Sequence, residues 1–440
     1  MFLSLIESFR KENHASLKAW YERLVVLFAA VCVGFLVVGF SKLSNYSIQC
    51  FWRYQKVYWW LPLILTPLAG MVIVWFTNRW FSGSKGSGIP QTIAAIDLPK
   101  NKSNEISKFI SLRIAFGKIF LGAAGLLSGF SAGREGPSVQ IGASVMHAFG
   151  SLLPKSSTIN HKQLILAGAA AGISAAFNTP LAGVVFAIEE LGRGLNDKNN
   201  SIVITAIVIA GLVSIWLVGN YNYFGSIYNF GSIYISEVSR SIILPVIVCA
   251  LCCGVLGGIF SKILIHFTTV QEGPISRIRK ANPIYWAGFC GLIVAILGVI
   301  SEGKAHGSGY FYTKQMLDGL ISPSWDYAPI KFLATIFTYL SGIPGGIFSP
   351  SLSIGAGIGN DLIPLIGDYA SVTTIIVMCM AGFLAAATQA PITTFVIVIE
   401  MTDGHDLVIS LMAVSLLASL VSKLFTKPFY SSLAANFARQ

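Results

Sequence analysis

One phrase occurs twice in this sequence, at positions separated by about half the length of the chain. Gly133–Ala143 is G-R-E-G-P-S-V-Q-I-G-A, and Gly346–Ala356 is G-I-F-S-P-S-L-S-I-G-A. A second pair follows in the same order, because Pro180–Glu189 (P-L-A-G-V-V-F-A-I-E) resembles Pro391–Glu400 (P-I-T-T-F-V-I-V-I-E). An apolar chain built from two related halves is typical of transporters, which hold their substrate where the halves meet.

The composition indicates an integral membrane protein. Hydrophobic residues make up 54% of the chain and charged residues only 11%, whereas a soluble domain has about a quarter charged residues. Runs without charge that are long enough to cross a bilayer recur along the chain: Val57–Asn78, Gln163–Ile188, Ser201–Ser236, Ser241–Ser261, Ala281–Ser301, Phe332–Asn360 and Tyr369–Ile399. Gly or Pro interrupts several of them, which predicts an all-α polytopic protein with broken helices.

The repeats predict a division of the chain into five segments. These are a cytoplasmic N-terminal segment (1–23), a first membrane repeat (24–220), a connection (221–240), a second membrane repeat (241–433) and a C-terminal tail (434–440). We assign most of the formal charge of +11 to cationic cytoplasmic loops and a smaller part to vestibules that concentrate anions.

Several classes of function are excluded by missing patterns. A nucleic-acid partner is not expected, because no basic stripe interleaved with aromatic residues occurs on a soluble domain. A metal site is not expected either, since Cys249, Cys252 and Cys253 have no His or acidic residue nearby. An intramembrane enzyme is disfavoured because the chain has no H-E-x-x-H, no P-loop and no hydrolase elbow, and no cofactor is implied.

Four phrases place Gly or Pro at the expected start or end of an apolar helix. They are Gly86–Pro90 (G-S-G-I-P), Gly133–Pro137 (G-R-E-G-P), Gly345–Pro350 (G-G-I-F-S-P) and Lys427–Tyr430 (K-P-F-Y). A helix N-terminus presents free N–H groups and a partial positive charge. Several such ends directed at one place would bind an anion without a full positive charge, so that the anion can leave again.

Two acidic residues occur in the first copy of the repeated phrases only. Glu135 stands where the second copy has Phe348, and Glu190 stands where it has Met401. Burial in apolar surroundings disfavours the charged form of a carboxyl group and favours its protonation. An ionised Glu135 could occupy the anion site itself, and its protonation would release the site.

The neighbouring acid Glu189 is different, because the second copy keeps an acid at the same place, Glu400. An alternative for Glu189 and Glu190 is a helix C-terminal pair bound to Arg193 or Lys198. That alternative fits Glu189 better than Glu190, so Glu190 is the stronger candidate for moving a proton.

Together, the four phrases resemble the CLC family of chloride channels and chloride/proton antiporters, and the resemblance covers roughly residues 24–433. It implies the CLC fold, in which two inverted-topology repeats consist of broken and tilted helices. It further implies a bacterial type without CBS domains, a multi-pass location in the cell membrane (the inner membrane of a bacterium) and a homodimer. The chain departs from the family pattern at Gln91, where an acid is common, and this affects local charge pairing only.

The resemblance also assigns roles to individual residues. The hydroxyl groups of Ser87 and Tyr430 and the backbone amides of Ile347 and Phe348 would bind chloride. Glu135 would be the external gate. The second acid of the P-L-A-G…E-E phrase, Glu190, would transfer protons on the intracellular side, and Lys118 and Lys331 resemble basic positions of the bacterial members.

These observations predict a secondary transporter that exchanges chloride for protons, with a gating glutamate that competes with chloride. The alternative is a passive chloride channel of the same fold, gated by voltage or pH. Glu190 favours the exchanger, because a channel has no need of an intracellular proton acceptor. Nitrate and fluoride are alternative substrates, and the resemblance favours chloride because a serine, Ser87, stands at the anion site.

Overall fold

The computed structural model describes residues 2–99, 105–154, 156–157, 159–192, 200–220, 222–226, 242–269 and 273–437. Its regular structure in these ranges is helical, apart from two isolated bridges. The helices of the first half are α1 (Phe2–Val57), α2 (Leu61–Trp80), α3 (Ile89–Asp97), α4 (Leu112–Leu127), α5 (Glu135–Phe149), α6 (His161–Phe177), α7 (Pro180–Phe186) and α8 (Asn200–Val218). Short turns of other helical types are η1 (Ser82–Ser84), η3 (Gly150–Leu152) and the π-helical η4 (Ala187–Leu191).

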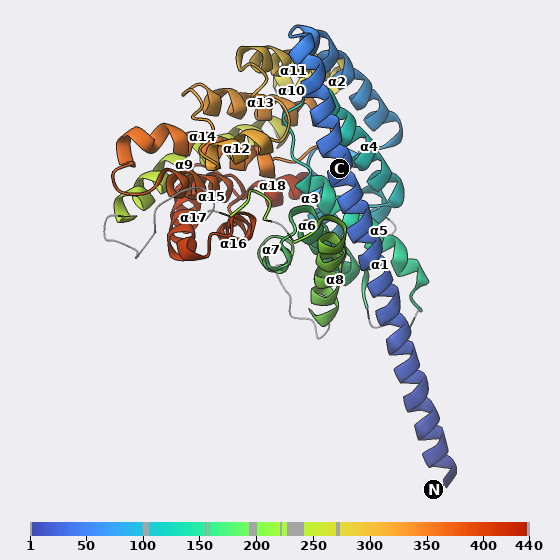
Figure 1. Cartoon of the computed structure of the whole chain (residues 1–440). Helices are drawn as coiled ribbons and strands as arrows, with labels where there is room; N and C mark the ends of the chain where they lie inside the picture. Colours follow the sequence, from blue (N-terminus) through green and yellow to red (C-terminus); the bar gives the residue numbers. More distant parts are fainter. Residues whose placement is uncertain are drawn as a thin grey trace.

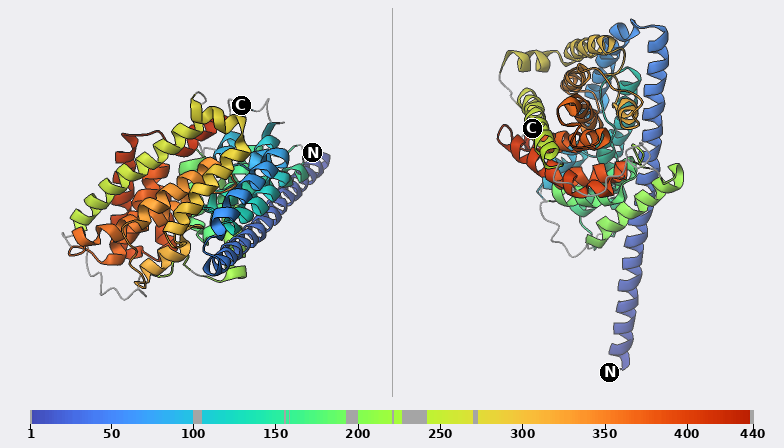
Figure 2. Two further views of the ribbon diagram at one scale, coloured as in Figure 1. Left: turned by 90° about the horizontal axis from the view of Figure 1, so that it is seen from above. Right: turned by 60° about the vertical axis from the view of Figure 1, so that its left-hand side comes forward.

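The second half repeats this succession of helices. It contains α9 (Ile243–Thr269), α10 (Pro274–Ala281), α11 (Pro283–Ile300), α12 (Tyr310–Leu317), α13 (Tyr327–Ser341), α14 (Phe348–Ile366), α15 (Val372–Thr388), α16 (Pro391–Thr402), the short η7 (His405–Leu407), α17 (Val408–Lys423) and α18 (Phe429–Phe437). Figures 1 and 2 show the first half, blue to green, beside the second half, yellow to red, with the N-terminal end of α1 extending beyond the other helices. α1 runs through the segment boundary expected at residue 24 without a break.

Seven helices among the described residues are long and apolar enough to cross a membrane. Others are too short to span it alone, including α7, with 7 residues, and α16, with 12 residues. Both begin directly at a proline, Pro180 and Pro391, which is favourable in the first turn of a helix because proline has no N–H to satisfy. The broken helices expected from the Gly and Pro positions are therefore present.

Corresponding turns of the two halves have the same backbone conformation. α6 ends at Asn178 with φ 60°, and α15 ends at Gln389 with φ 61°. Both residues adopt the left-handed conformation that commonly terminates a helix, and a Pro begins the next helix two residues later in each half. The likeness of the two halves thus extends from the sequence to backbone geometry.

Small residues allow the central helices of each half to pack closely. A Cβ atom at Gly142 of α5 would lie 2.1 Å from the carbonyl oxygen of Gly168 in α6, and one at Gly355 of α14 would lie 2.4 Å from that of Cys379 in α15. Gly142 and Gly355 are equivalent residues of the repeated phrase. Close contacts of this kind are the usual means by which helices associate in lipid, and here they hold α5 and α14 in a fixed position.

Candidate functional site

The two copies of the repeated phrase meet in the structure. The N–H of Gly133 donates to the carbonyl of Gly346 at 2.7 Å, and the N–H of Gly346 donates to the carbonyl of Gly133 at 2.8 Å. Because α5 and α14 each begin two residues after these glycines, their N-termini lie next to each other. The place where the two copies meet therefore has the positive ends of two helices, α5 and α14.

Glu135, the first residue of α5, turns its carboxylate toward the other half of the molecule. The hydroxyl of Ser349 donates to Oε1 of Glu135 at 2.5 Å, and the Ser349 N–H approaches Oε2 at 3.5 Å. The Glu135 side chain is fully buried, with 0% of its surface exposed. Its carboxylate thus lies at the N-terminus of α14, where backbone N–H groups are free to bind negative charge.

The neighbouring Arg134 is engaged with other elements. Its guanidinium donates to the carbonyl of Ser41 at 2.9 Å and to Oδ1 of Asn45 at 2.8 Å, both in α1. It also lies over the ring of Tyr223, 5.3 Å from the ring centroid, a distance at which a cation is attracted by the π-system. Arg134 therefore links the start of α5 to α1 and to the residues that follow α8.

Two buried hydroxyl groups converge on the same region from other elements. Ser87, which precedes α3, is 1% exposed, and Tyr430, in α18, is 0% exposed. The two hydroxyls lie near each other, yet neither forms a hydrogen bond of acceptable geometry with the described part of the chain. Because an unsatisfied buried hydroxyl is unfavourable, the two hydroxyls are available as donors to an acceptor such as an anion.

Ile347 and Phe348 lie beside these hydroxyls. Ile347 is the N-cap residue of α14 and Phe348 its first helical residue, and both are buried. The ring of Phe348 stacks on that of Tyr430, with centroids 6.0 Å apart and planes 16° apart. The structure thus brings Ser87, Tyr430, Ile347 and Phe348 together, as expected from the sequence.

Glycines make these approaches possible. A Cβ atom at Gly133 would lie 2.3 Å from Oε2 of Glu135, and one at Gly136 would lie 2.3 Å from Oγ of Ser87. Either contact is far shorter than van der Waals separation, so a side chain at these positions would displace the carboxylate or the hydroxyl. The glycines of the G-R-E-G-P phrase are therefore required by space around the site.

The two buried lysines anchor loops by equivalent contacts. Nζ of Lys118, in α4, donates to the carbonyls of residues 84–86, at 2.7, 3.4 and 2.6 Å. Nζ of Lys331, in α13, donates to the carbonyls of Ala305 and Gly307, at 2.9 and 2.7 Å. Lys118 therefore anchors the loop that carries Ser87, while Lys331 anchors the corresponding loop of the second half.

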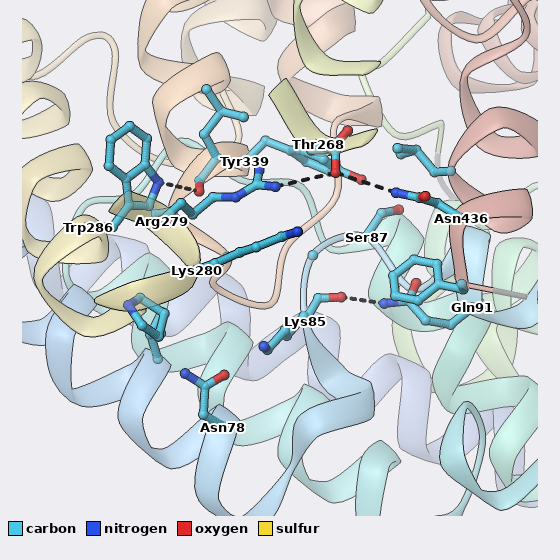
Figure 3. A pocket seen from close by; sticks show the side chains of 18 residues that line it. Asn78, Lys85, Ser87, Gln91, Thr268, Arg279, Lys280, Trp286, Tyr339 and Asn436 are labelled. Atoms are coloured by element: carbon cyan, nitrogen blue, oxygen red, sulfur yellow. Dashed lines mark hydrogen bonds between the residues drawn. The ribbon is translucent and has the colours of Figure 1, made fainter. Parts of the chain in front are cut away.

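A cavity of about 400 Å³ leads to Ser87. Lys85, Arg279 and Lys280 surround the same hollow as Ser87 (Figure 3), and none of the described residues that line it is acidic. Arg279 also donates to the carbonyl of Thr268 at the end of α9, at 3.3 Å. A cationic hollow of this kind raises the local concentration of anions.

Gln91, the departure from the family pattern, is involved in a local contact at the same cavity. Its Nε2 donates to the carbonyl of Lys85 at 2.5 Å, as the dashed line in Figure 3 shows. This bond joins the first turn of α3 to the loop that precedes it.

The adjacent acids Glu189 and Glu190 have different surroundings. Both lie in the π-helical turn η4, and such turns occur frequently at functional sites. Oε1 and Oε2 of Glu189 accept hydrogen bonds from the N–H groups of Ile392 and Thr393, at 3.1 and 2.6 Å. Glu190 is half-buried and interacts electrostatically with Tyr430, whereas Arg193 and Lys198, the alternative partners considered above, lie outside the described residues.

Two residues of the site were not identified from the sequence. Ser349 was part of the quoted phrase G-G-I-F-S-P, but its counterpart in the first copy is Gly136, so the comparison of the copies gave no reason to single it out. Tyr223 lies after α8, is 3% exposed and lies close to Ser349. Only its place among aromatic residues between the repeats could have drawn attention to it.

Comparison with known proteins identifies relatives over nearly the whole chain. A family model described as "Voltage gated chloride channel" matches residues 69–423. The chain is 28% identical to the H(+)/Cl(-) exchange transporter ClcA of Klebsiella pneumoniae over 93% of its own length and 88% of that protein. It is 29% identical to the ClcA of Cronobacter sakazakii over 87% of its length and 81% of that protein.

Solved structures agree with this result. A slow cyanobacterial Cl⁻/H⁺ antiporter superposes with a TM-score of 0.78 at 24% identity, over 95% of this chain and 98% of the other. A CLC-type fluoride/proton antiporter superposes with a TM-score of 0.74 at 23% identity, over 91% and 95% of the two chains. These matches confirm the all-α, polytopic membrane fold expected from the sequence.

Proposed function

The chain belongs to the voltage-gated chloride channel family, and we propose that it is a secondary transporter that exchanges chloride for protons. It is a multi-pass membrane transporter and not an enzyme. The proposal is supported by the relatives named above, several of which are exchangers of chloride and protons. The observation that carries it is the position of the Glu135 carboxylate at the N-terminus of α14.

In this proposal the Glu135 carboxylate and a chloride ion compete for one place. Both are stabilised by the N–H groups and the positive end of α14. When Glu135 takes up a proton, its carboxyl group loses the negative charge that these groups attract, and the side chain can leave. An anion then occupies the position. When the anion leaves and the carboxylate returns, the proton passes toward Glu190 and the opposite face, so that proton and anion move in opposite directions.

The permeating anion would be bound by Ser87, Tyr430 and the amides of Ile347 and Phe348. Two hydroxyl donors and a helix N-terminus stabilise an anion without a buried positive side chain, which permits its release. The cationic cavity around Lys85 and Lys280 would supply anions to Ser87 from one side. Glu135 would close the pathway at the other side.

Glu190 would give protons a separate entry. It is half-buried and lies near Tyr430, which is also near Glu135. A proton acceptor away from the anion cavity allows proton transfer to Glu135 without passage through the cationic hollow, where a proton would be repelled.

The test is simultaneous measurement of chloride and proton flux from liposomes that contain the purified protein. Under an outward chloride gradient with no pH gradient, an exchanger must move protons inward against their equilibrium, and a protonophore must abolish the gradient that forms. Chloride flux without proton movement would establish a passive channel instead. Repeating the measurement with fluoride and with nitrate tests the choice of chloride.

We further propose a homodimer with one pathway in each subunit. Closed two-fold symmetry is the commonest state of oligomers, and helices rich in small residues associate well in lipid. Photobleaching of singly labelled subunits in bilayers would show two steps per particle. A predominance of one-step particles with full activity would contradict the dimer.

A further inference from the structure

The hydrogen bond between Ser349 and Glu135 joins the two halves at the proposed gate. Ser349 is 2% exposed and Glu135 is 0% exposed, so water does not compete for the 2.5 Å contact between their side chains. The first copy of the phrase cannot form an equivalent bond, because Gly136 stands at the position that corresponds to Ser349. A backbone N–H could bind the carboxylate at this position without help from a side chain. The Ser349 hydroxyl is therefore a second donor.

The charged and titratable groups that face Glu135 come from several elements. Arg134, on its own helix, is bound to α1. Tyr223 lies close to Ser349 and Glu135, and Tyr310 of α12 packs against the Tyr223 ring with centroids 4.6 Å apart. Tyr430 of α18 also interacts with Glu135, and Glu190 interacts with Tyr430 in turn.

The side chain of Ser349 donates directly to the carboxylate. A hydroxyl donates a strong hydrogen bond to an ionised carboxylate and a weaker one to a neutral carboxyl group. The bond therefore stabilises Glu135 in its ionised state with the side chain at the end of α14. Protonation and displacement by an anion are both opposed by it.

We propose that Ser349 is a positioning residue that holds the gate closed and thereby sets the external pH and the chloride concentration at which exchange begins. The inference rests on the proposed role of Glu135 as the gate. It adds Ser349, from the phrase G-I-F-S-P, to the residues that determine the pH and chloride dependence of exchange.

The experiment compares Ser349→Ala with the unmodified protein in liposomes. Loss of the hydroxyl should shift the external pH dependence of chloride flux toward alkaline pH by about one pH unit, because a hydrogen bond to an ionised group has that magnitude. The KM for external chloride should fall, since the anion meets a weaker competitor. Proton coupling should persist, because Glu135 and Glu190 are unchanged.

Three controls separate this effect from a general loss of packing. Ser349→Thr retains a hydroxyl and should restore the original pH dependence. Ser349→Gly reproduces the residue of the first copy and should behave like Ser349→Ala. Ser351→Ala removes a buried hydroxyl of the same helix that has no partner in the described part of the chain, and it should leave the pH dependence in place.

The outcomes distinguish this inference from the proposed function. If Glu135→Gln abolishes coupling while Ser349→Ala and Ser349→Gly keep the original pH dependence and KM, the role of Ser349 is refuted and the gate stands. If Glu135→Gln remains coupled, the gate itself is refuted. In the Glu135→Gln background, Ser349→Ala should have no further effect on pH dependence, and a shift there would show that Ser349 acts through another group.

Discussion

Glu189 and Glu400 are equivalent residues of the two repeats, and the carboxylate of each binds the start of a helix that belongs to the other repeat. Glu189 accepts hydrogen bonds from the two amides that follow Pro391 in α16, at 3.1 and 2.6 Å. Glu400 accepts them from the two amides that follow Pro180 in α7, at 3.2 and 2.7 Å. Each acid thus satisfies free N–H groups of the opposite half, which explains why both copies have an acid at this place and leaves Glu190 for another role.

We predict that Glu190→Gln abolishes proton movement while chloride flux is largely retained, because an amide cannot carry a proton. Paired flux measurements in liposomes provide the check. Glu189→Ala should instead keep coupling and lower the free energy of unfolding by about 0.5–2 kcal/mol, the range for loss of a helix cap. Glu400→Ala is the matched control and should be destabilising to a similar degree, and loss of coupling in Glu189→Ala would reassign the proton role.

Glu135→Gln should uncouple transport. The side chain can no longer compete with chloride as a carboxylate or take up an external proton, so chloride should move passively and proton flux should disappear. The dependence of chloride flux on external pH should also flatten, because the titrating group is gone. If both fluxes fell by the same factor and still responded to external pH, Glu135 would be a structural residue rather than a gate.

Ser87→Pro should shift selectivity away from chloride toward a larger anion such as nitrate. The change removes both the hydroxyl donor and the backbone N–H, and loss of one hydrogen bond to an ion corresponds to about a tenfold change in preference. The ratio of nitrate to chloride flux is the measurement. Tyr430→Phe, which keeps the ring that stacks on Phe348, is the companion variant, and an unchanged ratio in Ser87→Pro would exclude Ser87 as a ligand.

Lys118→Met should raise the KM for chloride, because the carbonyls of residues 84–86 lose their anchor and Ser87 moves with them. Lys331→Met provides a control of the same size and burial in the other repeat. Both changes leave buried carbonyls without a donor and should lower the free energy of unfolding by about 1–3 kcal/mol. Thermal unfolding in detergent measures this loss, and an equal rise of KM in both variants would show that loop anchoring does not act through Ser87.

Much of the fold could be predicted because its signals are local and repeated. The duplicated phrases, the apolar runs and the Gly and Pro positions indicated two related halves of broken helices, as observed. Ser87, Tyr430, Ile347 and Phe348 could be named because each lies within a short phrase at a helix end. The difference between the copies at Glu135 and Glu190 was also visible without any structure.

What the sequence by itself determined is therefore the repeated architecture and the identity of the residues at the helix ends, since these follow from composition and spacing along the chain. Only the tertiary structure decided that Ser349 binds Glu135, that Glu189 caps α16 and that the two lysines hold backbone loops. The physical reason is that most of these contacts join residues that are far apart in the sequence and depend on how the N-terminal ends of α5 and α14 meet and how α7 packs against α16. A hydrogen bond across such a junction is set by differences of a few tenths of an ångström, which no local pattern encodes.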